Sequence, residues 1–163
     1  MTISSKLLAE FDTEMKATRR VLERVPEDKA EWKPHPKSFS LAHLAQLLSW
    51  MPGWITNTVA STELNLTGTP KYSIEKTSTL LDLFDKNVRE ARAAIEAAKD
   101  SDYDVMWSLK GGDKVFMSAP RGDVVRQHMS HLSHHRGQMT VYLRLLDVPV
   151  PSIYGPTADE KWS

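Results

Sequence analysis

The chain has 163 residues but no cysteine and no net charge, and both absences limit its chemistry. Without cysteine it cannot form a disulfide, a thiolate zinc site or a cysteine nucleophile, so any thiol in its reactions must come from another molecule. Lysine plus arginine equal aspartate plus glutamate at 21 each, and there is no basic stripe. We therefore expect neither nucleic acid nor an anionic membrane as a partner.

Long apolar runs are also missing. No stretch has the roughly 18 consecutive uncharged apolar residues of a membrane-spanning helix, and the N-terminal region carries charges every few positions, unlike a secretory signal peptide. We expect a soluble, cytoplasmic protein, which also agrees with the lack of cysteine. With 40% hydrophobic residues, the length predicts a single domain over residues 1–163 with a buried core.

Apolar residues recur at alternating steps of three and four in four stretches, the spacing of a helix with one buried stripe. The pattern predicts helices from Ser4 or Ser5 to Val25, from Ser40 through a kink at Pro52, over residues 73–98, and from 121 to about Asp147. The tail from Pro149 to Ser163, with three prolines, should lie extended over the helices.

Two segments between these stretches lack the helical period. Residues 61–72 are long for a direct helix connection and predict a crossover. Gly111-Gly112-Asp113 joins two short stretches and predicts a β-hairpin. We therefore predict an all-α fold, a four-helix bundle with a long crossover between helices two and three and a small β-hairpin before the last helix.

Four of the six histidines lie between His128 and His135 in the last predicted helix. At about 100° per residue, His131 and His135 lie one turn apart on the same face, the spacing of two metal ligands. His128 and Tyr142 fall on the same side as the apolar residues, so the histidines should occupy the buried stripe. We predict that His128, Gln138 and Tyr142 line a pocket there.

This cluster leaves two interpretations open. The histidines bind a metal ion, or they are hydrogen-bonded in place without one. A metal site needs a third ligand, and His128 is unsuited because it lies about 10 Å along the helix axis from His135. His43, at the edge of the apolar arc of the second predicted helix, is the remaining candidate. No catalytic residue can be named from these patterns.

The sequence resembles the DinB/YfiT-like family of metal-dependent four-helix proteins, which includes thiol-dependent S-transferases and the mycothiol-dependent maleylpyruvate isomerase. The resemblance covers nearly the whole chain. Its motifs are His131-Leu-Ser-His-His135-Arg-Gly-Gln138, Val141-Tyr-Leu-Arg144, Trp32-Lys-Pro-His-Pro36 with Ser38, and Pro151-Ser-Ile-Tyr-Gly-Pro156.

The resemblance implies a metal held by three histidines, two from the last helix and one from the second. His131 and His135 match the pair, whereas the second-helix position falls on Leu47, one turn after His43. In one interpretation His131, His135 and His43 hold a divalent ion such as Zn²⁺ or Ni²⁺, with an open position for water or a low-molecular-weight thiol. The substrate is an unidentified small molecule.

In the other interpretation the protein is a metal-free relative that binds a small molecule or forms a dimer. Trp50 and Trp54 crowd the edge of the second predicted helix, and exposed aromatic residues are typical of interfaces. We therefore predict a homodimer that buries one helix pair.

Overall fold

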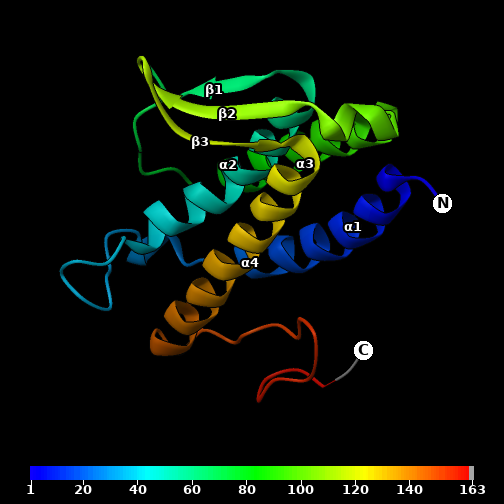
Figure 1. Ribbon diagram of the computed structural model, residues 1–163. Helices are drawn as coiled ribbons and strands as arrows, with labels where there is room; N and C mark the ends of the chain where they lie inside the picture. The colour runs from blue at the N-terminus through cyan, green and yellow to red at the C-terminus, as the bar shows by residue number, and fades with distance from the viewer. Residues whose placement is uncertain (162–163) are drawn as a thin grey trace.

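A computed structural model describes residues 1–161, which are mostly helical and carry a small three-stranded sheet (Figure 1). The helices are α1 (Ile3–Leu22), α2 (Leu41–Ala60), α3 (Thr77–Ala97) and α4 (Arg121–Leu145). The strands are β1 (Glu63–Asn65), β2 (Met106–Gly111) and β3 (Lys114–Pro120), and the short 3₁₀ turns are η1 (Glu27–Lys29) and η2 (Asp100–Asp104). The four predicted helices and the hairpin are confirmed. The last two residues of the predicted extended tail, 162 and 163, lie outside the described residues.

Helices α1 and α2 begin at residues whose side chains accept from free backbone N–H groups. Ser40 accepts from the N–H of His43 at 3.2 Å and caps α2 as predicted. The predicted cap of α1 was wrong, because Thr2 caps this helix by accepting from the N–H of Ser5. Ser4 is buried instead, and its hydroxyl donates to the carbonyl of Ala98 at 2.9 Å.

Helix α2 continues through Pro52, which has no N–H to donate within the helix. Near this interruption, the side chain of Asn87 on α3 donates to the carbonyl of Ser49 at 2.8 Å. Proline leaves the carbonyl of Leu48, four residues earlier, without its helical donor. The bond from Asn87 to the next carbonyl ties α3 to α2 beside this interruption.

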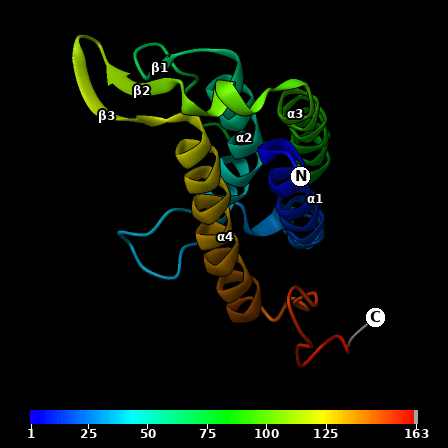
Figure 2. The same cartoon turned by 45° about the vertical axis from the view of Figure 1, so that its right-hand side comes forward.

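The hydrophobic core lies between the four helices, since α2 and α1 each contact both α3 and α4 (Figure 2). Its largest fully buried apolar side chains outside the sheet come from all four helices: Phe11, Leu22, Leu41, Leu44, Leu48, Met51, Ile55, Phe84, Ile95 and Met129. No helix within residues 1–161 is long and apolar enough to cross a membrane.

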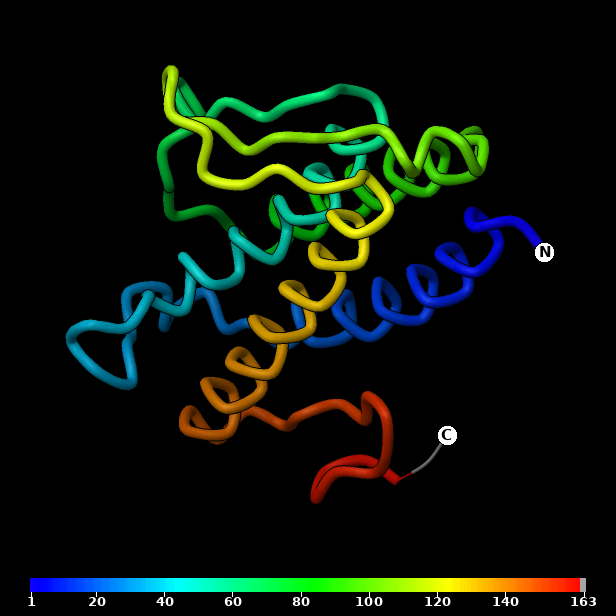
Figure 3. Tube along the Cα trace, in the orientation of Figure 1, coloured from blue at the N-terminus to red at the C-terminus, as the bar shows by residue number. Residues whose placement is uncertain are grey.

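The sheet was only partly predicted, because β1 joins the hairpin as a third strand. The order is β1-β2-β3, with β1 parallel to β2 and β2 antiparallel to β3. The register places Leu64, Leu109 and Met117 in one row across the strands. Successive strand residues point to opposite faces, so this row forms an apolar face. The sheet lies across the ends of α2 and α4, as the chain trace shows (Figure 3).

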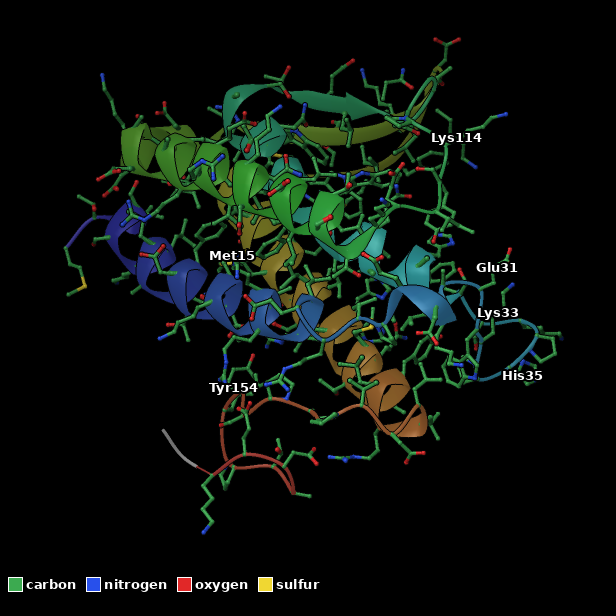
Figure 4. All side chains as sticks on the ribbon, turned by 180° about the vertical axis from the view of Figure 1, so that it is seen from behind. Met15, Glu31, Lys33, His35, Lys114 and Tyr154 are labelled. Carbon is green, nitrogen blue, oxygen red and sulfur yellow. The ribbon has the colours of Figure 1, made fainter. Side chains whose placement is uncertain are left out.

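Residues 146–161, which follow α4, have no regular secondary structure and run back along α1 (Figures 3 and 4). Tyr154 reaches α1 from this tail, where its hydroxyl bonds to Glu14 at 2.8 Å. Glu160 forms ion pairs with Arg20 and Arg24 on the same helix. The tail is therefore held over the helices by polar contacts, in line with its predicted path.

Candidate functional site

The four histidines of α4 do not share one environment. His135 is buried at 8% exposed, His128 is half-buried, and His131 and His134 are exposed. The prediction that the cluster occupies the buried stripe was therefore wrong for His131. Helix α4 begins directly after β3, so its N-terminal turns lie beside the sheet.

His131 and His135 are brought together as their spacing predicted. Their Nε2 atoms lie 2.9 Å apart, because residues four apart stack on one helix face. The Nδ1 atom of His135 lies 2.7 Å from Oε1 of Gln138, and Nε2 of Gln138 lies 3.2 Å from Nε2 of His134. A carbonyl oxygen only accepts, so His135 carries its proton on Nδ1 and has a lone pair on Nε2.

Gln138 thus fixes the tautomer of His135 from outside the pair. This is the role that hydrogen-bonded neighbours take around metal-binding histidines. In the bonded pair, Nε2 of His131 donates to Nε2 of His135. Partial burial, followed by the charges of His135 and His134, lowers the pKa of His131.

His43 lies between two aromatic rings and not between the imidazoles of the pair. Its ring stacks on Phe39 at 4.1 Å and on Tyr72 at 3.9 Å between centroids. Burial lowers the pKa of His43, and the charges of Lys33 and His135 lower it further. Leu47, one turn later on α2, is half-buried and packs on the core.

The residues present fit only part of a metal site. Two nitrogen ligands at about 2.0–2.1 Å from one ion lie roughly 2.9 Å apart at right angles and roughly 3.4 Å apart in a tetrahedron. The pair of His131 and His135 matches this range. Within residues 1–161, however, no three His, Cys, Asp or Glu side chains are grouped to hold an ion. The donor set fits two ligand positions and does not fit the three-histidine site that the resemblance implies.

A cavity of about 300 Å³ lies beside the pair, beneath the apolar face of the sheet. We call it the imidazole cavity, because His128 and His131 form part of its wall. Its other lining residues are Trp54, Leu64, Leu66, Trp107, Leu109, Met117 and Gln127. It is therefore an apolar space with a few polar groups on the α4 side.

His128 is the most strongly perturbed histidine of this wall. Burial, with a smaller contribution from the charge of His131, lowers the pKa of His128 from 6.5 to about 4. Its ring packs edge-on against Trp107 and near Trp54. Nε2 lies 3.2 Å from the hydroxyl of Thr58. His128 is therefore neutral at pH 7.

The other predicted pocket residues have structural partners. Tyr142 is buried, meets Trp32 edge-on and donates to the carbonyl of Phe39 at 3.2 Å. Gln138 holds His135 and does not line the imidazole cavity. Of the three residues predicted to line a pocket, His128 is the one found on this wall.

Sequence reasoning missed the sheet side of the cavity. Trp107, Leu109 and Met117 belong to the predicted hairpin. Trp107 and Leu109 alternate with polar residues, which was a usable signal for one buried face, whereas Met117 follows two apolar residues and gave none. Leu64 gave no such signal, because β1 has only three residues. Trp50 and Trp54 line cavities within the chain. The position of these two tryptophans is therefore explained without a second copy of the chain. The dimer itself stays a prediction.

The DinB family model matches residues 1–162. A DinB-like protein from Bacillus cereus ATCC 10987 is 22% identical, with a TM-score of 0.74 over 91% of this chain and 95% of that chain. The DinB-like protein YjoA from Bacillus subtilis is 17% identical, with a TM-score of 0.71 over 96% and 99%. At such identities the two structures establish the fold alone.

A shorter match is found in sequence. Over 44 residues the chain is 48% identical to the uncharacterized protein YrdA of Bacillus subtilis strain 168. This match spans 27% of the chain and 26% of YrdA.

Proposed function

This chain belongs to the DinB family, and we propose that it binds a small, largely apolar molecule in the imidazole cavity. The observation that carries the proposal is a cavity of about 300 Å³ with apolar walls and two imidazoles. Small-molecule sites commonly have this size and this combination of apolar lining with a few polar groups. In this proposal the helices form a four-helix bundle, residues 61–76 are its long crossover, and the sheet closes the cavity.

A cavity-filling substitution tests this proposal. Met117→Trp adds an indole to the row of Leu64 and Leu109, and we expect binding of the uncharged fluorophore N-phenyl-1-naphthylamine to weaken at least tenfold. Ser118→Trp is the matched control, because this exposed neighbour lies on the opposite face of β3 and bonds to Ser108. Fluorescence titration measures both variants.

Two results would refute the proposal. The first is the absence of saturable binding to the wild-type protein. The second is unchanged affinity in Met117→Trp while its unfolding transition shows that it is folded.

Metal-dependent chemistry is a second candidate function, favoured by the convergence of His131 and His135. These two residues would hold a divalent ion such as Zn²⁺ or Ni²⁺, and Gln138 would keep His135 in the tautomer that a metal requires. A bound ion lowers the pKa of a coordinated water or thiol toward neutrality. A low-molecular-weight thiol is the co-substrate that fits this candidate, since the chain has no cysteine.

Calorimetric titration of untagged protein with Zn²⁺ tests the second candidate. Structural zinc sites bind with ~10–16 kcal/mol shared among four ligands, so one added ligand is worth roughly a hundredfold in affinity. Leu47→His should therefore raise the affinity by about that factor. His135→Ala should abolish binding, whereas His134→Ala should leave it largely intact.

The titration also separates the two arrangements of ligands. Tight binding by the wild type that Leu47→His does not improve would mean that His43 already completes the site. Loss of binding in His43→Ala would then identify it as the third ligand. No binding by either wild type or Leu47→His would reject His131 and His135 as ligands.

A further inference from the structure

We propose that the molecule bound in the imidazole cavity presents a hydrogen-bond donor, a hydroxyl, thiol or amine, to His128 and His131, and that carboxylates and phosphates are excluded. This inference rests on the proposed small-molecule function and adds the chemical class of the ligand.

The hydrogen bonds of Thr58 determine what His128 can offer. The Thr58 hydroxyl has one hydrogen, and it is donated to the carbonyl of Trp54 at 2.9 Å. Nε2 of His128, 3.2 Å from the same oxygen, must therefore be the donor in that contact. A neutral imidazole has one N–H, so the remaining nitrogen, Nδ1, is an acceptor. Nδ1 bonds to no protein group within residues 1–161. It is also not one of the fully buried atoms that lack a partner, so it is accessible to a ligand.

His131 reaches the same state through a different chain of bonds. Its Nε2 donates to His135, because the proton of His135 is engaged by Gln138. Nδ1 of His131 is therefore also an acceptor, and His131 is exposed on the cavity wall. Both imidazoles thus offer the ligand a lone pair and not an N–H.

The rest of the wall does not supply a cation. No lysine or arginine is among the lining residues described for this cavity. Within residues 1–161, the indole N–H of Trp107 is buried without a partner and is out of reach of a water-sized molecule. The accessible N–H groups of the lining, the exposed amide of Gln127 and the indole of the half-buried Trp54, are neutral. A carboxylate would lose its hydration here without gaining a partner of opposite charge, which is strongly unfavourable. The low pKa of His128, about 4, agrees with a wall that stays neutral.

The apolar part of the ligand has room to extend. A second cavity of about 380 Å³ shares Trp54, Leu64 and Leu66 with the imidazole cavity and continues past Trp50 and Leu83. The two spaces therefore lie next to each other and share part of their walls. A linear apolar chain attached to the donor group fits this arrangement.

Two isomers provide a direct test. 1-Octanol and heptyl methyl ether have the same formula and similar apolar surface, but only the alcohol can donate a hydrogen bond. We expect 1-octanol to bind the wild-type protein about tenfold more tightly, the ratio that a net bond of about 1.4 kcal/mol gives. Octanoate should bind more weakly than the ether. Competition with N-phenyl-1-naphthylamine measures all three ligands.

Substitution of the imidazole locates the effect. His128→Phe keeps an aromatic ring in the wall but removes the acceptor, so the alcohol-to-ether ratio should fall toward one while the ether still binds. His35→Phe is the control, since His35 is exposed in the connector loop after η1 (Figure 4) and should leave the ratio at about ten.

The possible outcomes separate the two proposals. If the alcohol and the ether bind the wild type equally, the cavity binds small molecules but the donor preference is wrong. If octanoate binds best, the inference is also overturned. If none of the three displaces the fluorophore and the fluorophore itself does not bind, the proposed function fails together with the inference. The wild-type ratio decides the matter even if His128→Phe does not fold.

Discussion

Helix α4 carries two polar clusters on different faces, and they differ in how completely their hydrogen bonds are satisfied. On one face Arg136, only 2% exposed, forms an ion pair with Glu14 at 2.7 Å and bonds to Thr18 and Tyr154. On the other face His131 and His128 each keep a lone pair that bonds to no group within residues 1–161. The first cluster is closed by the tail, and the second opens into a cavity.

The difference separates a structural from a functional use of polar residues. A buried charge is tolerated only when it is paired and its hydrogen bonds are made, and the Arg136 cluster meets both conditions. Burial by itself would raise the pKa of Glu14, but hydrogen bonds from Tyr154 and Ser133 and the charge of Arg136 lower it overall. The histidine face leaves acceptors free, which costs little while water reaches them and allows a ligand to bind.

The largest expected effect comes from breaking the closed cluster. Glu14→Ala leaves the Arg136 guanidinium buried without its counter-charge, so we expect a loss of about 3–5 kcal/mol in the free energy of unfolding. Urea denaturation at pH 7 measures it. Asp12→Ala is the control. Asp12 lies on the same helix as Glu14 but is exposed, and it pairs with the exposed Arg92 of α3, so its loss should change the midpoint far less. Equal losses in both variants would show that the Arg136 pair is not special.

The next effect concerns the histidine face and appears only in acid. His128 has a pKa of about 4 in the folded protein, against 6.5 when exposed. Between these values the unfolded chain takes up a proton that the folded chain cannot, so stability falls as the pH drops from about 6.5 to 4, by at most ~3 kcal/mol. His128→Gln keeps a donor for Thr58 but cannot titrate. It should therefore reduce the loss of stability in this range and leave the part due to His43 and His131, whose pKa values are also lowered.

The two faces should therefore lose stability in different pH ranges. The pKa of Glu14 is lowered, so its contribution is present above pH 4.5 and is lost as the pH falls through its folded value. Urea midpoints at half-unit steps from pH 7.5 to 3.5 distinguish the ranges. A wild-type curve that is flat from 6.5 to 4.5 would contradict the placement of His128 in a buried, neutral state.

The helices could be predicted because their apolar period extends over several turns, as in α3 from Thr77 to Ala97. Ser40 could be identified as a cap from its residue type and position. Strand β1 could not be predicted from the sequence, since its pairing with β2 is a tertiary contact made by three residues. A tertiary contact also explains why Thr2 and not Ser4 caps α1. The hydroxyl of Ser4 donates to the carbonyl of Ala98, a contact that the local sequence does not reveal.

The site was predictable to the extent that it lies on one helix. The meeting of His131 and His135 follows from helix geometry, and it was found as expected. The stacking of His43 between Phe39 and Tyr72 joins three separate segments, so no local pattern contains it. The partners of Arg136 also come from separate segments, α1 and the tail, so no local pattern contains them. The charge of Arg136 gave no sign that this side chain is buried.

The smallest expected effect on stability comes from Gln138, whose side chain determines which nitrogen of His135 carries the proton. Gln138 is exposed, so replacing it by Met should lower the free energy of unfolding by only about 0.5–1 kcal/mol, since water can take over its bonds. The tautomer of His135 should nevertheless change. In the wild type the proton lies on Nδ1, because Oε1 of Gln138 accepts from it at 2.7 Å. In Gln138→Met the proton is free to move to Nε2, where it would block both the bond from His131 and a metal ion.

Long-range ¹H–¹⁵N correlation spectra of the imidazoles report this tautomer directly. Gln138→Glu is the matched control, because its carboxylate still accepts from Nδ1 and should keep the wild-type tautomer of His135. It cannot donate to Nε2 of His134, so only the spectrum of His134 should change. If the wild type already carries its proton on Nε2 of His135, the bond to His131 runs in the opposite direction. His131 would then present an N–H to the cavity in place of a lone pair. His128 would accept a hydrogen bond from the ligand, whereas His131 would donate one.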